Sequence, residues 1–238
     1  LDDCDIIVFM TQDAVLTSVE SLHKLLAAFA DPDVAIAFGK QLPRPGAGPI
    51  EAHARLFGYP AQSRIKSKES IPEIGLRAAV VSNSFAAYRR STLLALGGFP
   101  KGTLFGEDTL TGAKAILAGY KIAYVGDAAV YHSHGYTLAQ EFRRYFDNGA
   151  FYSREKWILK AFGAAEGSGK AYVLSEMRYL IRKAPWLLPL SGITVLVKYL
   201  GYRFGSMESR IPANWKIHLS MNKTFWRKEI AQLNSTMG

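Results

Sequence analysis

The sequence contains one cysteine, Cys4, among its 238 residues. A single cysteine excludes an internal disulfide and the common cysteine-rich zinc sites, and it favours a reducing compartment. Long apolar runs are missing too. The longest one near the end, residues 184–197, is interrupted by two prolines, a serine and a glycine. Because a helix needs about 20 apolar residues to cross a bilayer, this run is too short and too broken to span a membrane.

An excess of acidic residues is also absent, since the formal net charge is +9. Residues 1–150 hold 15 basic and 15 acidic side chains, whereas residues 151–238 hold 14 and 5. A basic end indicates contact with nucleic acid, anionic lipid or a phosphorylated ligand, or simply a solvated helical surface. The neutral first part and the lack of a basic recognition helix or stacking motif argue against nucleic acid.

The order of apolar and polar residues indicates an α/β fold. Strand and helix patterns alternate up to about residue 135, which predicts a mostly parallel sheet flanked by helices. The apolar run over residues 6–10 predicts a strand buried on both faces, and therefore a central one. We expect strands that would precede it to be absent from this chain. Further strands are expected at 34–38, 78–88, 121–125 and 128–132, and helices at about 17–29, 91–96, 109–118 and 136–151, with helical residues beyond 157.

Asp13 follows the first predicted strand directly. Ligands of open α/β sheets bind beyond the carboxyl ends of the strands. A carboxylate there suits Mg²⁺ or Mn²⁺ that also contacts phosphate oxygens. The alternative is that Asp13 caps the helix that follows. The residue alone leaves both interpretations open.

Two further groups could carry chemistry. Glu107 and Asp108 begin a predicted helix, where the helix dipole favours an ionised carboxylate that can accept a proton; capping is again the alternative. His132 and His134 end a strand and point to the same side of it. Histidines at this spacing can bind a metal ion, although each could instead be a hydrogen-bonded structural residue.

The order of these motifs resembles family 2 glycosyltransferases with the GT-A fold, most closely their bacterial rhamnosyltransferase branch. The resemblance extends over nearly the whole chain. It is carried by TQDA at 11–14, GKQLP at 39–43, RLFGYP at 55–60, SNSFAAYRR at 82–90, GGFP at 97–100, the acids at 107–108, AVYHSH at 129–134, EFRRYFDNG at 141–149 and MNKTFW at 221–226.

The resemblance implies a role for each candidate residue. Asp13 corresponds to the last acid of the family's DxD metal signature, and His132 or His134 completes a site for Mg²⁺ or Mn²⁺. Asp108 corresponds to the catalytic base of an inverting mechanism, with Glu107 as its neighbour. The residues expected to border the acceptor are Ser82, Asn83, Arg89 and Arg90.

The resemblance also implies an organisation and an activity. Residues 1–155 would form a partial, Rossmann-like GT-A catalytic domain without its N-terminal nucleotide-binding region, and residues 156–238 a basic helical segment. The implied reaction moves rhamnose from dTDP-rhamnose to a hydroxyl of a bacterial surface polysaccharide or lipid-linked glycan. The alternatives are transfer of galactofuranose or N-acetylglucosamine, or a non-catalytic binding module.

Such enzymes are expected in the cytoplasm, with peripheral contact to the inner face of the plasma membrane. Apolar residues between Trp186 and Tyr199, with basic residues nearby, suit a helical segment that lies in a membrane interface. The alternative is that these apolar residues pack onto the catalytic domain.

Overall fold

The computed structural model describes residues 4–163 and 168–236. They form two compact units. The sheet unit comprises Leu1–Pro100, Glu107–Gly135 and Ala161–Pro185, and the helical unit comprises Lys101–Gly106, Tyr136–Lys160 and Trp186–Gly238. The units alternate along the chain, so neither ends at the boundary expected near residue 155. The functional division at that residue stays a prediction.

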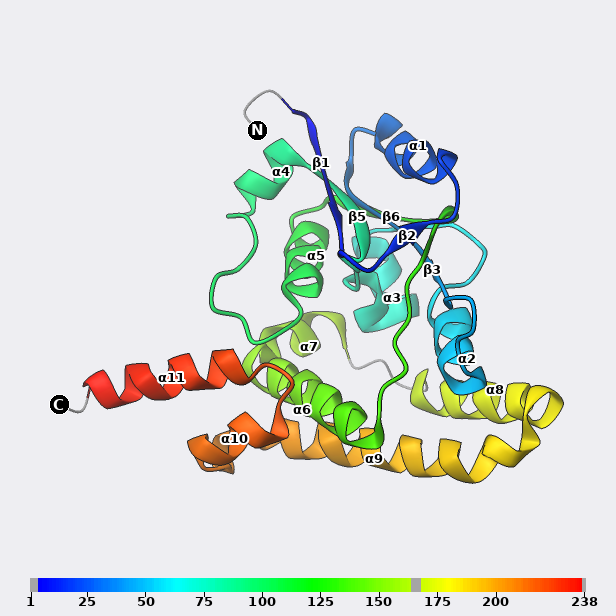
Figure 1. Ribbon diagram of the computed structural model, residues 1–238. Helices are drawn as coiled ribbons and strands as arrows, with labels where there is room; N and C mark the ends of the chain where they lie inside the picture. Colours follow the sequence, from blue (N-terminus) through cyan, green and yellow to red (C-terminus); the bar gives the residue numbers. More distant parts are fainter. Residues whose placement is uncertain (1–3, 164–167, 237–238) are drawn as a thin grey trace. The chain divides into compact units, whose positions relative to one another are not determined.

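The sheet unit is built on six strands, five of which are labelled in Figure 1 and follow the order β1-β5-β3-β6-β2. The sixth, β4, pairs with β6. The strands are β1 (Ile6–Met10), β2 (Val15–Leu16), β3 (Val34–Leu42), β4 (Arg64–Lys66), β5 (Phe85–Arg89) and β6 (Lys121–Tyr131). The helices are α1 (Glu20–Ala27), α2 (Pro49–Gly58), α3 (Ile71–Ile74), α4 (Arg90–Ala95), α5 (Glu107–Leu117) and α8 (Ser168–Lys183), with 3-10 turns η1 (Ala28–Ala30), η2 (Lys68–Ser70) and η3 (Gly75–Ala78).

The predicted α/β class is confirmed, but the predicted mostly parallel sheet is wrong. Only β3 and β6 pair in parallel, and the other four described pairings are antiparallel. The cause is the connection between β3 and β5. It starts at the carboxyl end of β3 and delivers Phe85 opposite Met10, the last residue of β1. β5 therefore starts beside the ends of β1 and β3, and it runs antiparallel to both of these neighbours.

Within the described residues β1 is not buried on both faces, and the strands expected to precede it stay a prediction. Among the described residues β1 pairs with β5 alone and lies at the sheet edge. Val8 and Met10 are 40% and 49% exposed, while the ring of Phe9 packs edge-on against Tyr88 and Phe99. The apolar run therefore predicted the strand correctly, and in this chain the strand lies at the edge of the sheet.

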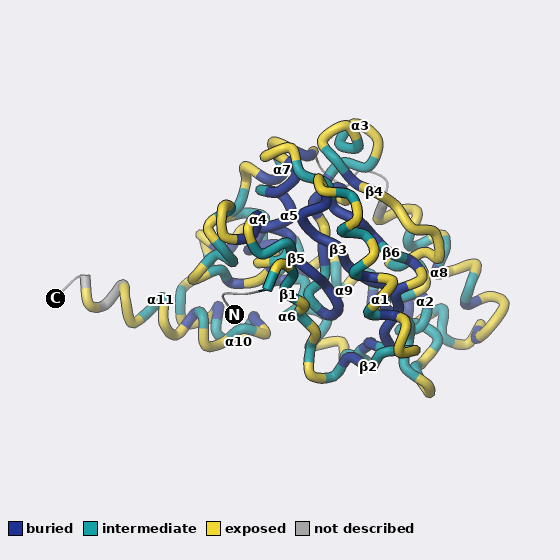
Figure 2. Tube along the Cα trace, turned by 90° about the horizontal axis from the view of Figure 1, so that it is seen from above, coloured by how far each residue is buried: buried dark blue, intermediate teal, exposed yellow. Residues whose placement is uncertain are grey.

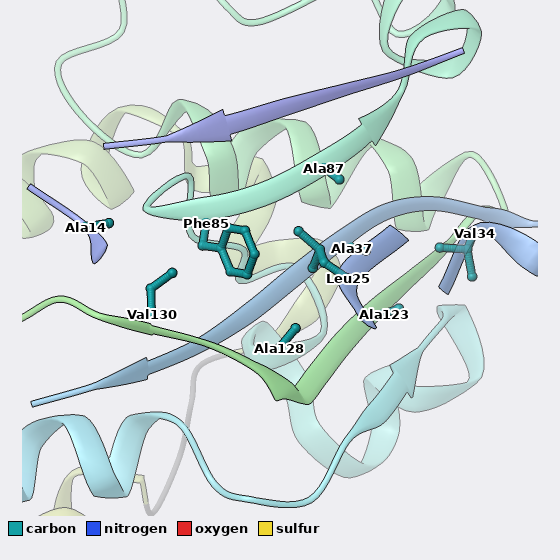
Figure 3. Close-up of a cluster of buried hydrophobic side chains, with 9 residues drawn as sticks. All are labelled: Ala14, Leu25, Val34, Ala37, Phe85, Ala87, Ala123, Ala128 and Val130. Atoms are coloured by element: carbon teal, nitrogen blue, oxygen red, sulfur yellow. The ribbon is translucent and has the colours of Figure 1, made fainter. Parts of the chain in front are cut away.

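The core of the sheet unit lies where α1 packs against β3, β5 and β6 (Figure 3). The first five residues of β3 are all buried, as its apolar run predicts (Figure 2). Gly39 in β3 has no room for a side chain, because an added Cβ would lie 2.4 Å from the Phe85 ring and from the Ala128 carbonyl oxygen. The two strands predicted at 121–125 and 128–132 are one strand, β6, with an irregular register opposite Gly39 and Lys40.

The helical unit packs α6 (Leu138–Arg154) against α9 (Leu188–Ser206). Glycines allow the two backbones to touch. An added Cβ on Gly201 or Gly205 would lie 2.4 or 2.0 Å from a carbonyl oxygen of α6. Thr137 and Gln140 form a capping box at the start of α6, which satisfies its first free amides. The unit is completed by η5 (Glu208–Arg210), α10 (Ala213–Leu219) and α11 (Lys223–Thr236), while α7 (Lys156–Phe162) and η4 (Pro185–Leu187) lie at the boundaries between the units.

Candidate active site

The structure brings Asp13, His132 and His134 together. Val15 in β2 pairs with Tyr131 at the end of β6, so the turn before β2 lies beside the residues that follow β6. The Asp13 carboxylate oxygens lie 3.4 Å from Nε2 of His132 and 3.5 Å from Nε2 of His134. The two Nε2 atoms are 3.1 Å apart. Among the described residues these three form a group that could hold a metal ion.

These distances fit a shared ion. Two ligand atoms bound about 2.1 Å from one ion, at right or tetrahedral angles, lie roughly 3.0–3.4 Å apart. Asp13 is not the helix cap that was the alternative, since α1 begins at Glu20 and its N-cap is Val19. Although burial raises the pKa of Asp13, the neighbouring histidines and Thr11 outweigh it and lower that pKa below its ordinary value.

Gln41 determines which nitrogen of His132 faces the cluster. The Gln41 oxygen Oε1 accepts a hydrogen bond from Nη1 of Arg55 at 2.8 Å. An arginine can only donate, so this atom is the amide oxygen. The same oxygen lies 3.0 Å from Nδ1 of His132, which must therefore carry a hydrogen. The lone pair of neutral His132 then sits on Nε2, pointing at Asp13 and His134.

Burial lowers the pKa of His132 to about 4, even though the Asp13 charge acts in the opposite direction. The imidazole is therefore neutral at pH 7, which is the form that binds metals. Arg44 also contacts the cluster. Its guanidinium lies 3.1 Å from Asp13 Oδ2 and donates to the Asp13 carbonyl oxygen. Both side chains are partly exposed, so Arg44 can turn from Asp13 to another anion.

The predicted base, Asp108, lies at the start of α5. Its two carboxylate oxygens accept main-chain hydrogen bonds, one from Asn83 at 3.2 Å and one from Thr109 at 2.7 Å. Burial and the neighbouring Glu107 charge raise the pKa of Asp108 to about 6, although those two bonds oppose the rise. A carboxylate with this pKa is mostly ionised at pH 7 and close to the optimum for general-base catalysis. Glu107 itself is exposed.

Tyr88 supports the Asn83 end of this arrangement. Its hydroxyl donates to the Asn83 side-chain oxygen at 2.6 Å, and its ring packs 5.2 Å from that of Phe99. Gly97 and Gly98 both have positive φ, 87° and 70°, which lets the chain turn sharply after α4 and return Phe99 to this position. The GGFP motif thus acts on the site through packing.

A path of hydrogen bonds and one peptide bond joins the candidate metal ligands to the base. The Gln41 amide nitrogen donates to Ser82 Oγ at 2.7 Å. Ser82 precedes Asn83, whose amide is bound by Asp108. The predicted residues Ser82 and Asn83 therefore lie between the two charged groups.

Arg89 and Arg90 lie elsewhere. Arg89 pairs with Ile6 at the beginning of β1, whereas Asp13 follows its end. The Arg89 guanidinium donates to the carbonyl oxygens of Val34 and Phe29. The structure does not bring these arginines to Asp108, because Asp108 contacts Asn83 before the start of β5, whereas Arg89 lies at the end of that strand.

The sequence of this chain is similar to those of known glycosyltransferases. Residues 6–222 match the family described as glycosyl transferase family group 2. The chain belongs to this family. The O-antigen chain rhamnosyltransferase WbaN of Salmonella anatum is 44% identical over 225 residues, which are 94% of this chain and 71% of the relative. RfbN of Salmonella typhimurium, of the same description, is 43% identical over 224 residues with the same coverage. The resemblance inferred from the motifs is confirmed.

Solved glycosyltransferase structures are more distant from this group 2 glycosyltransferase. The mannosyltransferase PcManGT from Pyrobaculum calidifontis, in complex with GDP-Man and Mn²⁺, is 19% identical with a TM-score of 0.47. The match covers 86% of this chain and 59% of that one. S. aureus TarS 1–349, in complex with UDP-GlcNAc, is 15% identical with a TM-score of 0.41, over 87% of this chain and 68% of that one.

Four contact residues were not among the predicted site residues: Gln41, Arg44, Arg55 and Tyr88. Gln41 was recognisable as a polar residue in the last part of an apolar strand. Arg44 lies between two prolines, and Tyr88 is the residue before the last one of β5. Neither position identifies the residue that it contacts. Arg55 reaches Gln41 from α2, and no local pattern reports such a contact.

Proposed function

We propose that this group 2 glycosyltransferase moves rhamnose from dTDP-rhamnose to a hydroxyl of an O-antigen glycan, with inversion at the anomeric carbon. One observation carries the mechanism: a three-ligand cluster and a partly buried carboxylate are joined through Gln41, Ser82 and Asn83. The two O-antigen rhamnosyltransferases that are 44% and 43% identical support the donor and the acceptor class. A GT-A arrangement of the catalytic domain is part of this proposal.

Asp108 accepts the proton of the acceptor hydroxyl. The acceptor oxygen then forms its bond to the anomeric carbon on the face opposite the diphosphate, and dTDP leaves with the electrons of the broken carbon–oxygen bond. Asn83 and Thr109 hold the carboxylate in place with their amides. The raised pKa of Asp108 leaves it basic enough to take the proton and still ionised at neutral pH. Glu107, exposed beside it, increases this basicity through its negative charge.

Asp13, His132 and His134 would hold a divalent ion that neutralises charge on the diphosphate as it departs. Imidazole nitrogens suit a transition-metal ion better than Mg²⁺, which prefers oxygen ligands. We therefore expect Mn²⁺ to serve better than Mg²⁺. Arg44, once it turns from Asp13, adds a bidentate donor for a phosphate oxygen.

A transfer assay tests the activity and the donor together. The protein is incubated with Mn²⁺, a lipid-linked O-antigen oligosaccharide and dTDP-rhamnose, UDP-galactofuranose or UDP-GlcNAc in separate reactions. Mass spectrometry should detect the addition of one deoxyhexose with the first donor alone. A product with either UDP-sugar would replace rhamnose as the donor, and no product with any donor would leave only a binding role.

The same proposal includes contact with a membrane surface through α9. Large apolar side chains are exposed along this helix at every third or fourth position, between 39% and 56% each: Leu190, Ile193, Leu196, Leu200 and Phe204. Its buried residues are small or polar: Ser191, Thr194, Gly201 and Gly205. This is the reverse of an ordinary surface helix, whose apolar face packs on the core.

An anionic lipid surface is the partner that fits this apolar face. Trp186 before α9 is 74% exposed, and Arg203 and Arg210 are exposed near its end. Residues 151–238 carry 14 basic and 5 acidic side chains. Apolar residues flanked by cations suit a helix that lies in the headgroup region. Among the described residues no helix is both long and apolar enough to cross the bilayer. The apolar face and the cations around it support the proposed location at the inner face of the plasma membrane.

Vesicle co-sedimentation tests this part. The protein should sediment with vesicles containing phosphatidylglycerol and much less with phosphatidylcholine alone. Replacing Leu196 and Phe204 by Ser should abolish sedimentation, whereas Leu174→Ser, at a residue 52% exposed on α8, should not. Equal sedimentation of the wild type and both variants would contradict the membrane role. A concentration-dependent dimer that the Leu196/Phe204 double variant disrupts would instead assign the apolar face of α9 to contact with a second copy of this chain.

A further inference from the structure

A pocket in the sheet unit lies beside the proposed active site, and Ser82 is the one lining residue that the proposed mechanism also uses. It has a volume of about 670 Å³ and is lined by residues of β3, β4, β6, α3 and η3, by the end of α2 and the chain that follows it, and by residues between η3 and β5. Pockets of roughly 300–1,000 Å³ commonly hold small molecules. Its size therefore suits a ligand of one or two rings.

All charged side chains that line this pocket are positive. Arg64, Lys66 and Arg77 line it, and no acidic residue is among the fourteen lining residues. Arg64 pairs with Glu73, which is not part of the lining. Lys66 is buried, and its ammonium group donates to the Val80 carbonyl oxygen at 2.6 Å. No described carboxylate forms an ion pair with it, so an ammonium with three donor hydrogens lacks an anionic partner.

The physical cost of this arrangement points to an anionic ligand. Burial, together with the charges of Arg64 and Arg77, lowers the pKa of Lys66 to about 7. An isolated buried cation is unfavourable unless it is paired. A bound phosphate would give Lys66 and Arg77 an anionic partner and Arg64 a second one besides Glu73, and it would favour the protonated form of Lys66.

Aromatic rings form another part of the pocket wall. Phe38, Phe57, Tyr59 and Tyr124 all line it. The rings of Phe38 and Tyr124 are 5.2 Å apart, and the ammonium of Lys66 lies 4.5 Å from the Phe38 ring centre. One face of a pyranose ring carries mainly C–H bonds, and such apolar faces pack well against aromatic rings. Cations next to aromatic surfaces thus fit a sugar that carries a phosphate.

Ser82 connects the pocket to the proposed active site. It lines the pocket, and its hydroxyl accepts the hydrogen bond from Gln41. The next residue, Asn83, is bound by Asp108. A ligand in the pocket therefore lies against the same short segment that the base holds.

We propose that this pocket binds a phosphorylated sugar of the acceptor, with the phosphate on Lys66, Arg64 and Arg77 and the sugar ring on the aromatic side chains. That the ligand belongs to the acceptor rests on the proposed function; the binding of a sugar phosphate does not. The phosphate of a lipid-linked glycan and that of a free sugar phosphate share this chemistry, and so does the diphosphate of the nucleotide donor. The experiment separates these sources.

Calorimetric titration of the full chain with galactose 1-phosphate tests the proposal, with free galactose and inorganic phosphate as component ligands. Galactose 1-phosphate should bind at least tenfold more tightly than either component. Lys66→Met and Arg77→Gln should each weaken it at least tenfold. The control Lys68→Met, at an exposed residue two positions along that does not line the pocket, should bind as the wild type does.

Additional titrations with variants and competing ligands identify the source of the phosphate. The same galactose 1-phosphate affinity is expected in Asp13→Asn and Asp108→Asn, so loss of transfer and loss of this pocket can be told apart. A lipid-linked sugar diphosphate should displace galactose 1-phosphate, whereas dTDP should not. Displacement by dTDP would assign the pocket to the donor and overturn the acceptor role, and displacement by neither would limit the site to free sugar phosphates.

A second readout needs no substitution. Lys66 should titrate below the other lysines in protein carrying ¹⁵N-labelled lysine, and galactose 1-phosphate should raise its titration midpoint. The charged groups that face it are Arg64 and Arg77, with Tyr59 and Tyr124 also in the pocket wall. An unchanged midpoint, or unchanged affinity in folded Lys66→Met, would overturn the proposal.

Discussion

The amide oxygen of Gln41 lies 3.0 Å from Nδ1 of His132, and this contact leaves the other ring nitrogen free to face Asp13. Gln41 is itself held by Arg55 on one side and Ser82 on the other. A buried amide with all these bonds has one orientation, so His132 has one tautomer. Contacts of this kind around metal-binding histidines commonly affect metal affinity as strongly as some direct ligands do.

Gln41→Leu should therefore weaken Mn²⁺ binding about 10–100-fold. The substitution removes the acceptor of the His132 hydrogen, and the ring can then change tautomer. Electron paramagnetic resonance titration of free Mn²⁺ measures the affinity, and ¹⁵N NMR of labelled histidine reports the tautomer without metal.

Gln41→Glu is the matched control for that prediction. A carboxylate keeps an acceptor for His132 and Arg55 but no longer donates to Ser82. Mn²⁺ affinity should remain close to that of the wild type. If the Leu variant bound Mn²⁺ as tightly as the Glu variant, Gln41 would have no part in positioning His132.

The metal dependence of transfer follows from the ligand set. Removal of divalent ions with EDTA should abolish transfer, and Mn²⁺ should restore it more fully than Mg²⁺ at equal concentration. His132→Ala and His134→Ala should each require far more Mn²⁺ for half-maximal activity. Full activity in EDTA would show that Asp13, His132 and His134 serve only to hold the turn.

The pH dependence of transfer should report Asp108. Its pKa of about 6 predicts that kcat/KM rises about tenfold per pH unit below pH 6 and levels off above it. The ionised form is the base, so the limb must lie on the acid side. A profile flat from pH 5 to pH 8 would contradict the assignment.

The same pKa makes a prediction about stability. The folded protein binds the Asp108 proton more tightly than the unfolded chain does, because the folded pKa of about 6 lies above the ordinary value of 3.8. The ionised carboxylate therefore destabilises the fold, and this effect appears as the pH rises from about 4 to above 6. One pKa unit corresponds to about 1.4 kcal/mol.

Asp108→Asn should accordingly be more stable than the wild type at pH 7.5 and not at pH 4. Loss of one main-chain hydrogen bond offsets part of the effect, so we expect a gain of about 1 kcal/mol. Urea unfolding at the two pH values measures it. A variant less stable than the wild type at both would mean that Asp108 is chiefly a structural acceptor.

The contact between α6 and α9 gives a prediction for the helical unit. Gly201→Ala should destabilise this unit by about 2–4 kcal/mol, since the new Cβ would meet the Phe142 carbonyl oxygen. The control Gly192→Ala on the same helix has open space around it, and it should stabilise by about 0.5–1 kcal/mol. Thermal unfolding of both variants checks the pair, and equal effects would contradict the close backbone contact.

Much of the fold follows from local patterns in the sequence. The apolar run in β3 and the acids at the start of α5 both predicted elements that the structure contains. Strand direction was not predictable in this way. The run in β1 has the composition of a central strand, yet Val8 and Met10 are exposed at an edge, because sheet order depends on contacts distant in sequence.

In the candidate site too, residues with a local sequence signal were predicted, and residues whose role depends on distant contacts were not. Asp13, His132 and His134 were identified by type and spacing, and the pairing of β2 with β6 brings them together. Arg89 shares a motif with Ser82, but Ser82 precedes β5 and Arg89 lies at the opposite end of this strand. Gln41 was missed as a site residue, because its role depends on partners 14 and 91 residues away.

The central claim is that one carboxylate performs the proton transfer while a separate cluster binds the metal. The most direct test measures rhamnosyl transfer and Mn²⁺ affinity on the same preparation of Asp108→Asn. Transfer should fall by roughly 10²–10⁴-fold, the usual contribution of a general base, while Mn²⁺ affinity stays at the wild-type value. Near-normal transfer, or loss of Mn²⁺ binding together with transfer, would contradict this account.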